Sequence, residues 1–426
     1  MKTYKALQEG KLKNATHVKI ACGLTAFPTE LYALASTLEV LDLTDNKLSS
    51  LPKEFSCFKK LKILFISNNL FTEVPPILAT LPALTMLGMR NNTIETLAEN
   101  TLPEQLRWLI LTDNHLHTLP QSMGKLKQLQ KCMLSGNQLT SLPKSMQACH
   151  NLELLRISVN QIPTLPIWLF SLPKLTWLAY GGNPCSHAHP SKKSTLASLS
   201  WKHLTLKEKL GEGASGTIYK ALYEEKEVAV KVFKGSITSD GLPEDEIQIN
   251  IALGVHPHLI DVLAKVTEHP QGNEVLMLEL IPSHFSNLGL PPTLESCTRD
   301  TYALPAPLSL EEVERILKGI LLAAIHMHKN GIMHGDFYAH NIMIDKDANV
   351  ILGDFGGATY CNPKEKALSV ARERLEVRAF GILVEEMLAL LPNTIESKTL
   401  TTLAQQCQNE QTEQRPTFEA LLEYFD

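Results

Sequence analysis

Three glycines and a lysine in the second half of the chain have the types and spacing expected of a phosphate-binding site. Gly211, Gly213 and Gly216 follow the pattern G-x-G-x-x-G, and a glycine backbone can approach phosphate oxygens because no side chain intervenes. The pattern lies between two alternating apolar segments that predict strands, which favours a phosphate-covering hairpin over the helix-opening turn of a dinucleotide fold. Lys231 follows fifteen residues after Gly216, at the end of the strand-like segment VAVK. This strand would place the lysine where the oxygens of a triphosphate lie.

A second set of polar residues follows in two short motifs. The segment HGDFYAHN contains Asp336 and Asn341, and Asp354 begins the triplet DFG thirteen residues after Asn341. In this order, the glycine pattern, VAVK, HGD and DFG resemble a eukaryotic-type protein kinase from about His203 to the end of the chain. Together the motifs are specific, although each alone is common in turns, strands or loops.

Two further motifs support the resemblance and indicate the elements that position the site. Ser309 and Glu312 form a capping-box pattern that predicts the start of an apolar-periodic helix, which runs through His328 and leads into the HGD segment. The sequence RPTF, at Arg415, matches the final motif of the kinase family. The resemblance therefore implies a two-lobed α+β kinase fold with the catalytic motifs on its loops and strand ends.

The resemblance also implies a role for each polar residue. Asp354 and Asn341 would supply oxygen ligands to Mg²⁺, and Asp336 would orient the acceptor hydroxyl and accept its proton. Asp336, Lys231 and Asn341 are thus the expected catalytic residues. The expected ATP-contacting residues, which include the backbone that would meet the adenine edge, are Gly211, Gly213, Gly216, Ile218, Ala229, Lys231, Glu246, Leu278, Glu279, Ile281 and Met343.

The carboxylate that would hold Lys231 is less clearly defined by the sequence. The predicted helix after the VAVK strand contains Glu244, Asp245 and Glu246. Glu246 matches the family best, but the alignment needs one extra residue, so Glu244 and Asp245 stay alternatives. The resemblance therefore implies an ion pair between Lys231 and this helix, with its partner among three neighbouring residues.

The catalytic segment does not specify the phosphate acceptor. Serine/threonine kinases carry a lysine two residues after the catalytic Asp, where this chain has Tyr338, and the Ala-Arg arrangement of tyrosine kinases is missing. The HGD start is also similar to that of phosphotransferases that act on small molecules. The favoured interpretation is an ATP- and Mg²⁺-dependent protein kinase acting on serine or threonine. The alternatives are a small-molecule phosphotransferase and a pseudokinase-like scaffold that binds nucleotide.

The segment after DFG is short and lacks a familiar regulatory contact. Only 22 residues separate Asp354 from Glu376, which occupies the position of an Asp on the large buried helix of the family. The family's arginine before the catalytic Asp, which pairs with a phosphorylated activation loop, is replaced by Gly335. We therefore expect activity without phosphorylation of this segment, with Arg372 or Arg374 as the alternative partner of a phosphate. The Pro-rich stretch 282–307 is either a lid or an ordinary surface insertion.

The first half of the chain is a repeat array. The string L-x-x-L-x-L-x-x-N recurs with successive asparagines 23, 23, 22, 23, 23 and 23 residues apart. Each L-x-L predicts a short strand with inward leucines, and each asparagine can hydrogen-bond the backbone of a turn shared with the neighbouring coil. The pattern resembles the leucine-rich repeat family over roughly residues 15–185, with residues 17–28 as an N-terminal cap. The seven asparagines are Asn46, Asn69, Asn92, Asn114, Asn137, Asn160 and Asn183.

The strand residues beside the inward leucine should face the concave side of the repeat sheet, because side chains alternate along a strand. The two columns are mostly apolar and contain two tryptophans, which indicates a protein substrate or partner. The alternatives are the kinase-like half of the chain and packing within a narrow horseshoe. The expected partner-binding residues are Ile63, Phe65, Trp108, Ile110, Met133, Leu154 and Trp177.

Composition sets limits on the remaining classes. With 44% apolar and 20% charged residues the chain is of ordinary globular type, and a net charge of -5 makes nucleic acid an unlikely partner. The sequence shows no signal-peptide core and no apolar run long enough to span a membrane, and its eight cysteines are scattered, which favours a cytoplasmic protein with reduced thiols. The predicted organisation is an α/β leucine-rich repeat solenoid at 1–185, a linker at 186–202, and kinase N- and C-lobes at 203–281 and 282–426.

Overall fold

The computed structural model describes residues 2–186, 196–213, 215–235, 241–304, 306–361 and 365–425. The chain forms two compact units, Met1–Leu175 and Thr176–Asp426. The sequence predicts that the repeat domain extends to residue 185, whereas the strand of the last repeat belongs to the second unit. Most of the predicted linker lies outside the described residues, and its end forms a strand, β9 (Ala197–Ser200).

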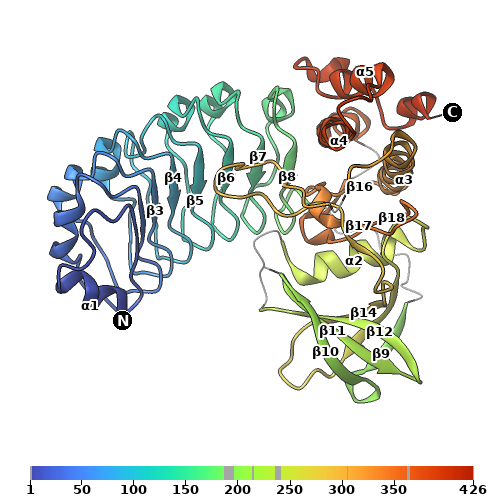
Figure 1. Ribbon diagram of the computed structural model, residues 1–426, viewed down its shortest axis with the longest axis horizontal. Coiled ribbons are helices and arrows are strands. Elements are labelled where there is room, and N and C mark those ends of the chain that lie inside the picture. The colour runs from blue at the N-terminus through green and yellow to red at the C-terminus, as the bar shows by residue number, and fades with distance from the viewer. Residues whose placement is uncertain are drawn as a thin grey trace. The chain divides into compact units, whose positions relative to one another are not determined.

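The first unit is a stack of repeat coils (Figure 1). Each coil contributes a strand of three residues, and neighbouring strands pair in parallel. In the interior strands the central residue is buried and the flanking residues are mostly half-buried, as the leucine pattern predicts. A short helix, α1 (Lys2–Gln8), precedes the strands. The strands of this unit are β1 (His17–Lys19), β2 (Val40–Asp42), β3 (Ile63–Phe65), β4 (Met86–Gly88), β5 (Trp108–Ile110), β6 (Lys131–Met133) and β7 (Leu154–Arg156).

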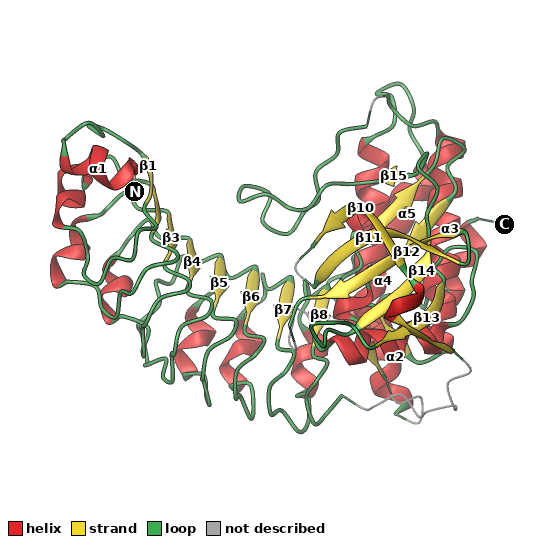
Figure 2. Ribbon diagram, turned by 90° about the horizontal axis from the view of Figure 1, so that it is seen from below, coloured by secondary structure: helices red, strands yellow, loops and turns green. Residues whose placement is uncertain are grey.

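The repeat asparagines form a buried ladder, which confirms the hydrogen bonds predicted for them. Asn92 is typical: its side-chain amide donates to the carbonyls of Ile66 and Met89, both at 3.1 Å, and its side-chain oxygen accepts from the backbone N–H of Phe71 at 3.1 Å. Because each buried asparagine satisfies turn backbone in its own coil and its neighbours, the ladder links successive coils. Most coils carry a 3-10 helix on the side away from the strands (Figure 2). These helices are Thr29–Leu34, Lys53–Cys57, Pro76–Thr80, Gln121–Lys125, Lys144–Ala148 and Ile167–Ser171.

The second unit contains a six-stranded sheet in the order β10-β11-β12-β14-β13-β9 (Figure 2). Strand β9 pairs in parallel with β13, and the other neighbours are antiparallel. The glycine pattern lies at the turn between β10 and β11, and Lys231 lies on the adjacent strand β12. The elements are β10 (Thr205–Glu212), β11 (Gly216–Tyr223), β12 (Lys226–Phe233), α2 (Pro243–Leu253), β13 (Val262–Thr267) and β14 (Val275–Glu279).

The rest of the second unit is mainly helical around one large apolar core. The predicted capping box is present, because Ser309 accepts from the backbone N–H of Glu312 and the Glu312 carboxylate accepts from that of Ser309. No described helix has the length and apolar character needed to cross a membrane. The elements are β8 (Trp177–Ala179), β15 (Ser286–Asn287), α3 (Leu310–Lys329), β16 (Ile332–Met333), β17 (Ile342–Ile344), β18 (Val350–Leu352), β19 (Thr359–Tyr360), α4 (Lys366–Ala389) and α5 (Lys398–Cys407).

Candidate active site

A buried ion pair connects strand β12 to helix α2. The Lys231 Nζ lies 2.5 Å from a carboxylate oxygen of Glu246, and both side chains are almost entirely buried. Of the three carboxylates that the sequence leaves open, Glu246 is therefore the one that pairs with the lysine, while Glu244 is exposed. The same Nζ lies 3.7 Å from the Asp354 carboxylate, whose side chain is 52% exposed. The ion pair with Glu246 thus holds the Lys231 ammonium beside the exposed carboxylate of Asp354, although Lys231 and Asp354 are far apart in sequence.

The segment HGDFYAHN folds so that Asp336 and Asn341 meet. The Asn341 side-chain amide donates to the backbone carbonyl of Asp336 at 2.9 Å and to its carboxylate at 3.3 Å. His334 is fully buried, packs on the ring of Phe355 and contacts the Gly353 carbonyl at 3.1 Å. These contacts join the loop around Asp336 to the DFG segment, so the predicted base and both predicted metal ligands belong to one framework.

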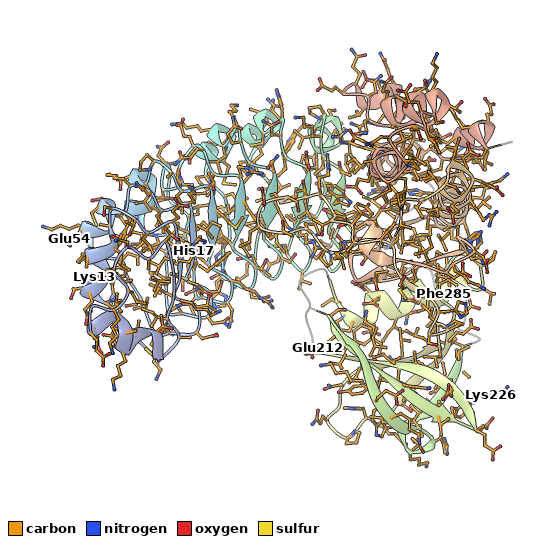
Figure 3. The ribbon with its side chains drawn as sticks, viewed as in Figure 1. Lys13, His17, Glu54, Glu212, Lys226 and Phe285 are labelled. Carbon is orange, nitrogen blue, oxygen red and sulfur yellow. The ribbon has the colours of Figure 1, made fainter. Side chains whose placement is uncertain are left out.

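The glycine pattern leaves open space on its inner turn. A Cβ atom added at Gly211 or Gly213 would meet no atom within 4 Å, whereas one at Gly216 would lie 2.7 Å from the Val232 carbonyl. Gly216 is therefore required by close packing of two strands, and the other two glycines keep backbone accessible. Glu212, labelled in Figure 3, ends β10. Its carboxylate pairs with Lys209 and Lys234.

The apolar residues predicted to surround adenine lie on neighbouring strands. Ala229 pairs in register with Leu278, and Ile218 with Lys231. Ala229 and Leu278 belong to one buried cluster, with Ile218 packed against it. Glu279 ends β14, Ile281 follows it, and Met343 is the half-buried central residue of β17. The structure therefore brings Ile218, Ala229 and Leu278 together on three neighbouring strands in the middle of the sheet that carries Lys231.

A buried carboxylate on helix α4 supports the segment HGDFYAHN, residues 334–341, which we call the catalytic loop after its predicted role. Glu376 accepts from the backbone N–H of Gly335 at 2.7 Å and lies 2.7 Å from the His328 Nε2. Burial alone would raise the pKa of Glu376, but the hydrogen bond and charge of His328, with His334 nearby, hold that pKa below its ordinary value. Glu376 thus occupies the place expected of the family's Asp and contacts the loop directly.

Gly335 has a backbone conformation and surroundings that exclude a side chain. Its φ is +75°, and a Cβ atom would lie 2.4 Å from the Gly357 carbonyl oxygen and 2.9 Å from that of Leu178. Both oxygens are backbone atoms, so neither can rotate out of the way. Any residue with a side chain would therefore be strained here and would clash with the structure around it.

The Pro-rich stretch contributes residues that the sequence did not assign to the site. The Asp300 carboxylate lies 2.7 Å from the His340 Nδ1 and accepts from the His340 backbone N–H at 2.9 Å. Burial would lower the pKa of His340, but the bond to Asp300 and the charges of Asp300, Asp336 and Asp354 raise it above the ordinary value. Strand β15 of this stretch pairs with β17. Much of the insertion is therefore packed on the catalytic loop, and the sequence signal for it was only the presence of a charged residue among prolines.

The expected partner-binding residues separate into two groups. Ile63, Phe65, Trp108, Ile110 and Met133 are half-buried on the strands of the first unit, whereas Leu154 is buried. Trp177 is only 2% exposed and its indole N–H donates to the Phe337 carbonyl at 3.0 Å. The structure therefore places Trp177 against the catalytic loop, which was the alternative to a partner surface.

The residues present fit a magnesium nucleotide. Lys231 offers a held cation, Asp354 and Asn341 offer oxygen donors, and the glycine turn has open space where backbone N–H groups can meet phosphate. Among the described residues no cluster of three or more His, Cys, Asp or Glu side chains could hold a metal alone. This donor set suits Mg²⁺, which keeps water and substrate phosphate among its ligands.

Comparison with known families agrees with both halves of the chain. Residues 204–377 match the protein kinase domain, residues 104–162 match a leucine rich repeat model, and residues 37–58 match a second such model. The chain therefore consists of leucine-rich repeats followed by a protein kinase domain, which confirms the predicted fold classes.

Several proteins named as serine/threonine-protein kinases are similar to part of the chain. One from Acanthamoeba polyphaga mimivirus is 27% identical over 41% of this chain and 30% of its own length. One from Dictyostelium discoideum is 30% identical over 34% of this chain and 8% of its own length, and the proto-oncogene kinase mos of Rattus norvegicus is 25% identical over 49% and 68%. The match thus spans less than a third of the length of the first two of these relatives.

A solved leucine-rich repeat protein of Leptospira interrogans is 32% identical, with a TM-score of 0.39, over 42% of this chain and 45% of its own.

Proposed function

We propose that this protein is an ATP-dependent protein kinase that transfers the γ-phosphate to a protein hydroxyl, with serine or threonine favoured. The observation that carries the proposal is the assembled Lys231–Glu246 pair beside Asp354, because phosphoryl transfer requires a held cation and metal-binding oxygens in one place. The names of the serine/threonine kinase relatives favour the acceptor type. The eight free cysteines support a cytoplasmic location.

Each residue would then have a defined task. Lys231, held by Glu246, would bind phosphate oxygens, and Asp354 with Asn341 would hold Mg²⁺, which supplies charge neutralisation on the phosphates when bound. Asp336 would accept a hydrogen bond from the acceptor hydroxyl and take its proton. Asn341, bonded to the Asp336 carbonyl, would keep the carboxylate in orientation.

Purified protein that comprises residues 1–426, incubated with Mg²⁺-ATP, tests the proposal. Phosphate on serine or threonine of protein acceptors, located by mass spectrometry, is the expected result. Nucleotide binding without transfer would instead support a pseudokinase-like scaffold, and ATP turnover that needs an added metabolite would support a small-molecule phosphotransferase. A comparison of cellular phosphorylation with the active and Asp354-substituted protein would then identify substrates.

Activity should not depend on phosphorylation of the segment between Asp354 and Glu376. Gly335 has no side chain to pair with a phosphate, Arg372 is buried and lies 3.3 Å from Glu365, and Arg374 donates to the Arg415 carbonyl. Treatment with a phosphatase is expected to leave the rate within about twofold of the untreated value. Loss of activity, with the removed phosphate mapped by mass spectrometry to this segment, would contradict the expectation.

The half-buried residues of the repeat strands are proposed to recruit the protein substrate. Trp108 is their largest side chain, and its ring carries the Lys131 ammonium 4.2 Å from its centre. For a substrate identified as above, Trp108→Ala should raise KM by at least about tenfold, because truncating a central aromatic often costs about 2 kcal/mol. Trp168→Ala, on the 3-10 helix Ile167–Ser171, is the matched control. Equal KM values for the two variants would remove Trp108 from the recruiting surface.

A further inference from the structure

Strand β8 and the turn after it form a part of the second unit that the family match does not include. The protein kinase match begins at residue 204, whereas residues 177–182 come from the last leucine-rich repeat. By sequence these residues are repeat residues like those of the preceding coils. By structure they contact the catalytic loop, the segment after DFG, helix α4 and helix α2, as the following contacts describe.

Trp177 makes three contacts around the catalytic loop. Its ring stacks on Tyr338, with ring centres 4.1 Å apart and planes 7° from parallel, and its N–H donates to the Phe337 carbonyl. The Arg299 guanidinium, from the Pro-rich insertion, lies 5.7 Å from the same ring. Phe337 and Tyr338 directly follow the predicted base Asp336. One buried indole is thus bonded and stacked next to the reacting group.

The residues after Trp177 contact the segment after DFG and helices α4 and α2. The Tyr180 hydroxyl lies 3.4 Å from the Cys361 Sγ, and its ring lies 5.7 Å from the Arg372 guanidinium at the start of α4. Gly181 lies close to helix α2, because a Cβ atom added to it would be 3.6 Å from the Asp245 carboxylate, next to Glu246. The segment therefore contacts both the loop that carries the base and the helix that holds Lys231.

We propose that residues 177–182 are a positioning element of the kinase, in which Trp177 holds the catalytic loop. The inference rests on the proposed kinase function. In kinases whose activation segment is phosphorylated, charge pairs supply this kind of order. Here the stacking of Trp177 on Tyr338 and its hydrogen bond to the Phe337 carbonyl supply it permanently, so the site is assembled without a modification.

The test uses the full-length protein and separates turnover from nucleotide binding. Trp177→Ala should lower kcat by at least about tenfold and change KM for ATP by less than about threefold, because it loosens the loop with the base and leaves Lys231 in place. Trp177→Phe keeps a stacking ring and loses the N–H donor, so its kcat should lie between those of wild type and Trp177→Ala. Trp168→Ala is the control for loss of a tryptophan.

Hydrogen–deuterium exchange supplies a readout that does not need activity. Peptides that cover residues 331–341 should take up deuterium faster in Trp177→Ala than in wild type or Trp168→Ala. Wild-type kcat and wild-type uptake in a folded Trp177→Ala protein would overturn the inference. If that variant does not fold, Trp177→Phe decides, and a wild-type kcat for it would overturn the hydrogen bond's role. A wild-type protein that transfers no phosphate refutes the proposed function, while the uptake comparison still tests the positioning.

Discussion

Asp354→Ala should abolish phosphotransfer and leave a folded protein. The carboxylate is 52% exposed and lies beside the Lys231 Nζ, so its removal disturbs little packing but leaves the site without a charged metal ligand. Without that ligand the charge on the transferring phosphate is not compensated, and we expect a fall in rate of about 10³-fold or more. The measurement is phosphate transfer at saturating Mg²⁺-ATP, with folding checked by thermal melting.

Two further variants make this result specific. Asp354 has a φ of +54°, which alanine adopts with strain and asparagine adopts readily. Asp354→Asn therefore tests the loss of charge with less backbone strain and should be almost as inactive. Asp347→Ala, at an exposed turn, should keep wild-type activity. Substantial transfer by Asp354→Asn would show that Asp354 is not the metal ligand.

Glu376→Ala is expected to have the largest effect on stability. It removes the acceptor of the buried Gly335 N–H and the partner of the half-buried His328. Breaking a buried pair in this way costs about 3 kcal/mol or more of the free energy of unfolding. Glu376→Gln keeps an acceptor for either the Gly335 N–H or His328, so its free energy of unfolding should fall less. Denaturant unfolding measures both, and equal stability of the alanine variant and wild type would contradict the supporting role.

The same residue gives a pH dependence with a definite sign. The pKa of Glu376 is held below its ordinary value of 4.5 in the folded protein, so the folded state binds fewer protons at this group than the unfolded state. Its contribution to stability is fully present above pH 4.5 and is lost as the pH falls through the lowered folded-state pKa. Glu376→Gln should therefore show a smaller loss of stability on acidification than wild type.

The fold was accessible from sequence because its signals are local and repeated. A 23-residue period and the capping box at Ser309 each define an element from neighbouring residues alone. The boundary of the units was not accessible in this way. Trp177 occupies the same repeat column as Trp108, and nothing in the repeat pattern distinguishes a strand that packs within the kinase unit from one that does not.

The site shows the same division. The motifs that contain Lys231 and Asp354 could be recognised because each is continuous in sequence, and the structure brings these two side chains together. The choice of Glu246 depended on how helix α2 is placed against β12, and the first turn of that helix carries three acidic residues. Asp300 contacts a residue 40 positions away, a distance over which sequence periodicity carries no information.

The geometry at Gly335 limits how phosphate control could be engineered into this kinase domain. An arginine at position 335, introduced so that the catalytic loop can pair with a phosphate, would need the volume that the Leu178 and Gly357 carbonyls fill. An arginine at this position and the present course of both backbone segments therefore exclude each other. A design that adds phosphate control here must move strand β8 at Leu178 and the turn at Gly357 together.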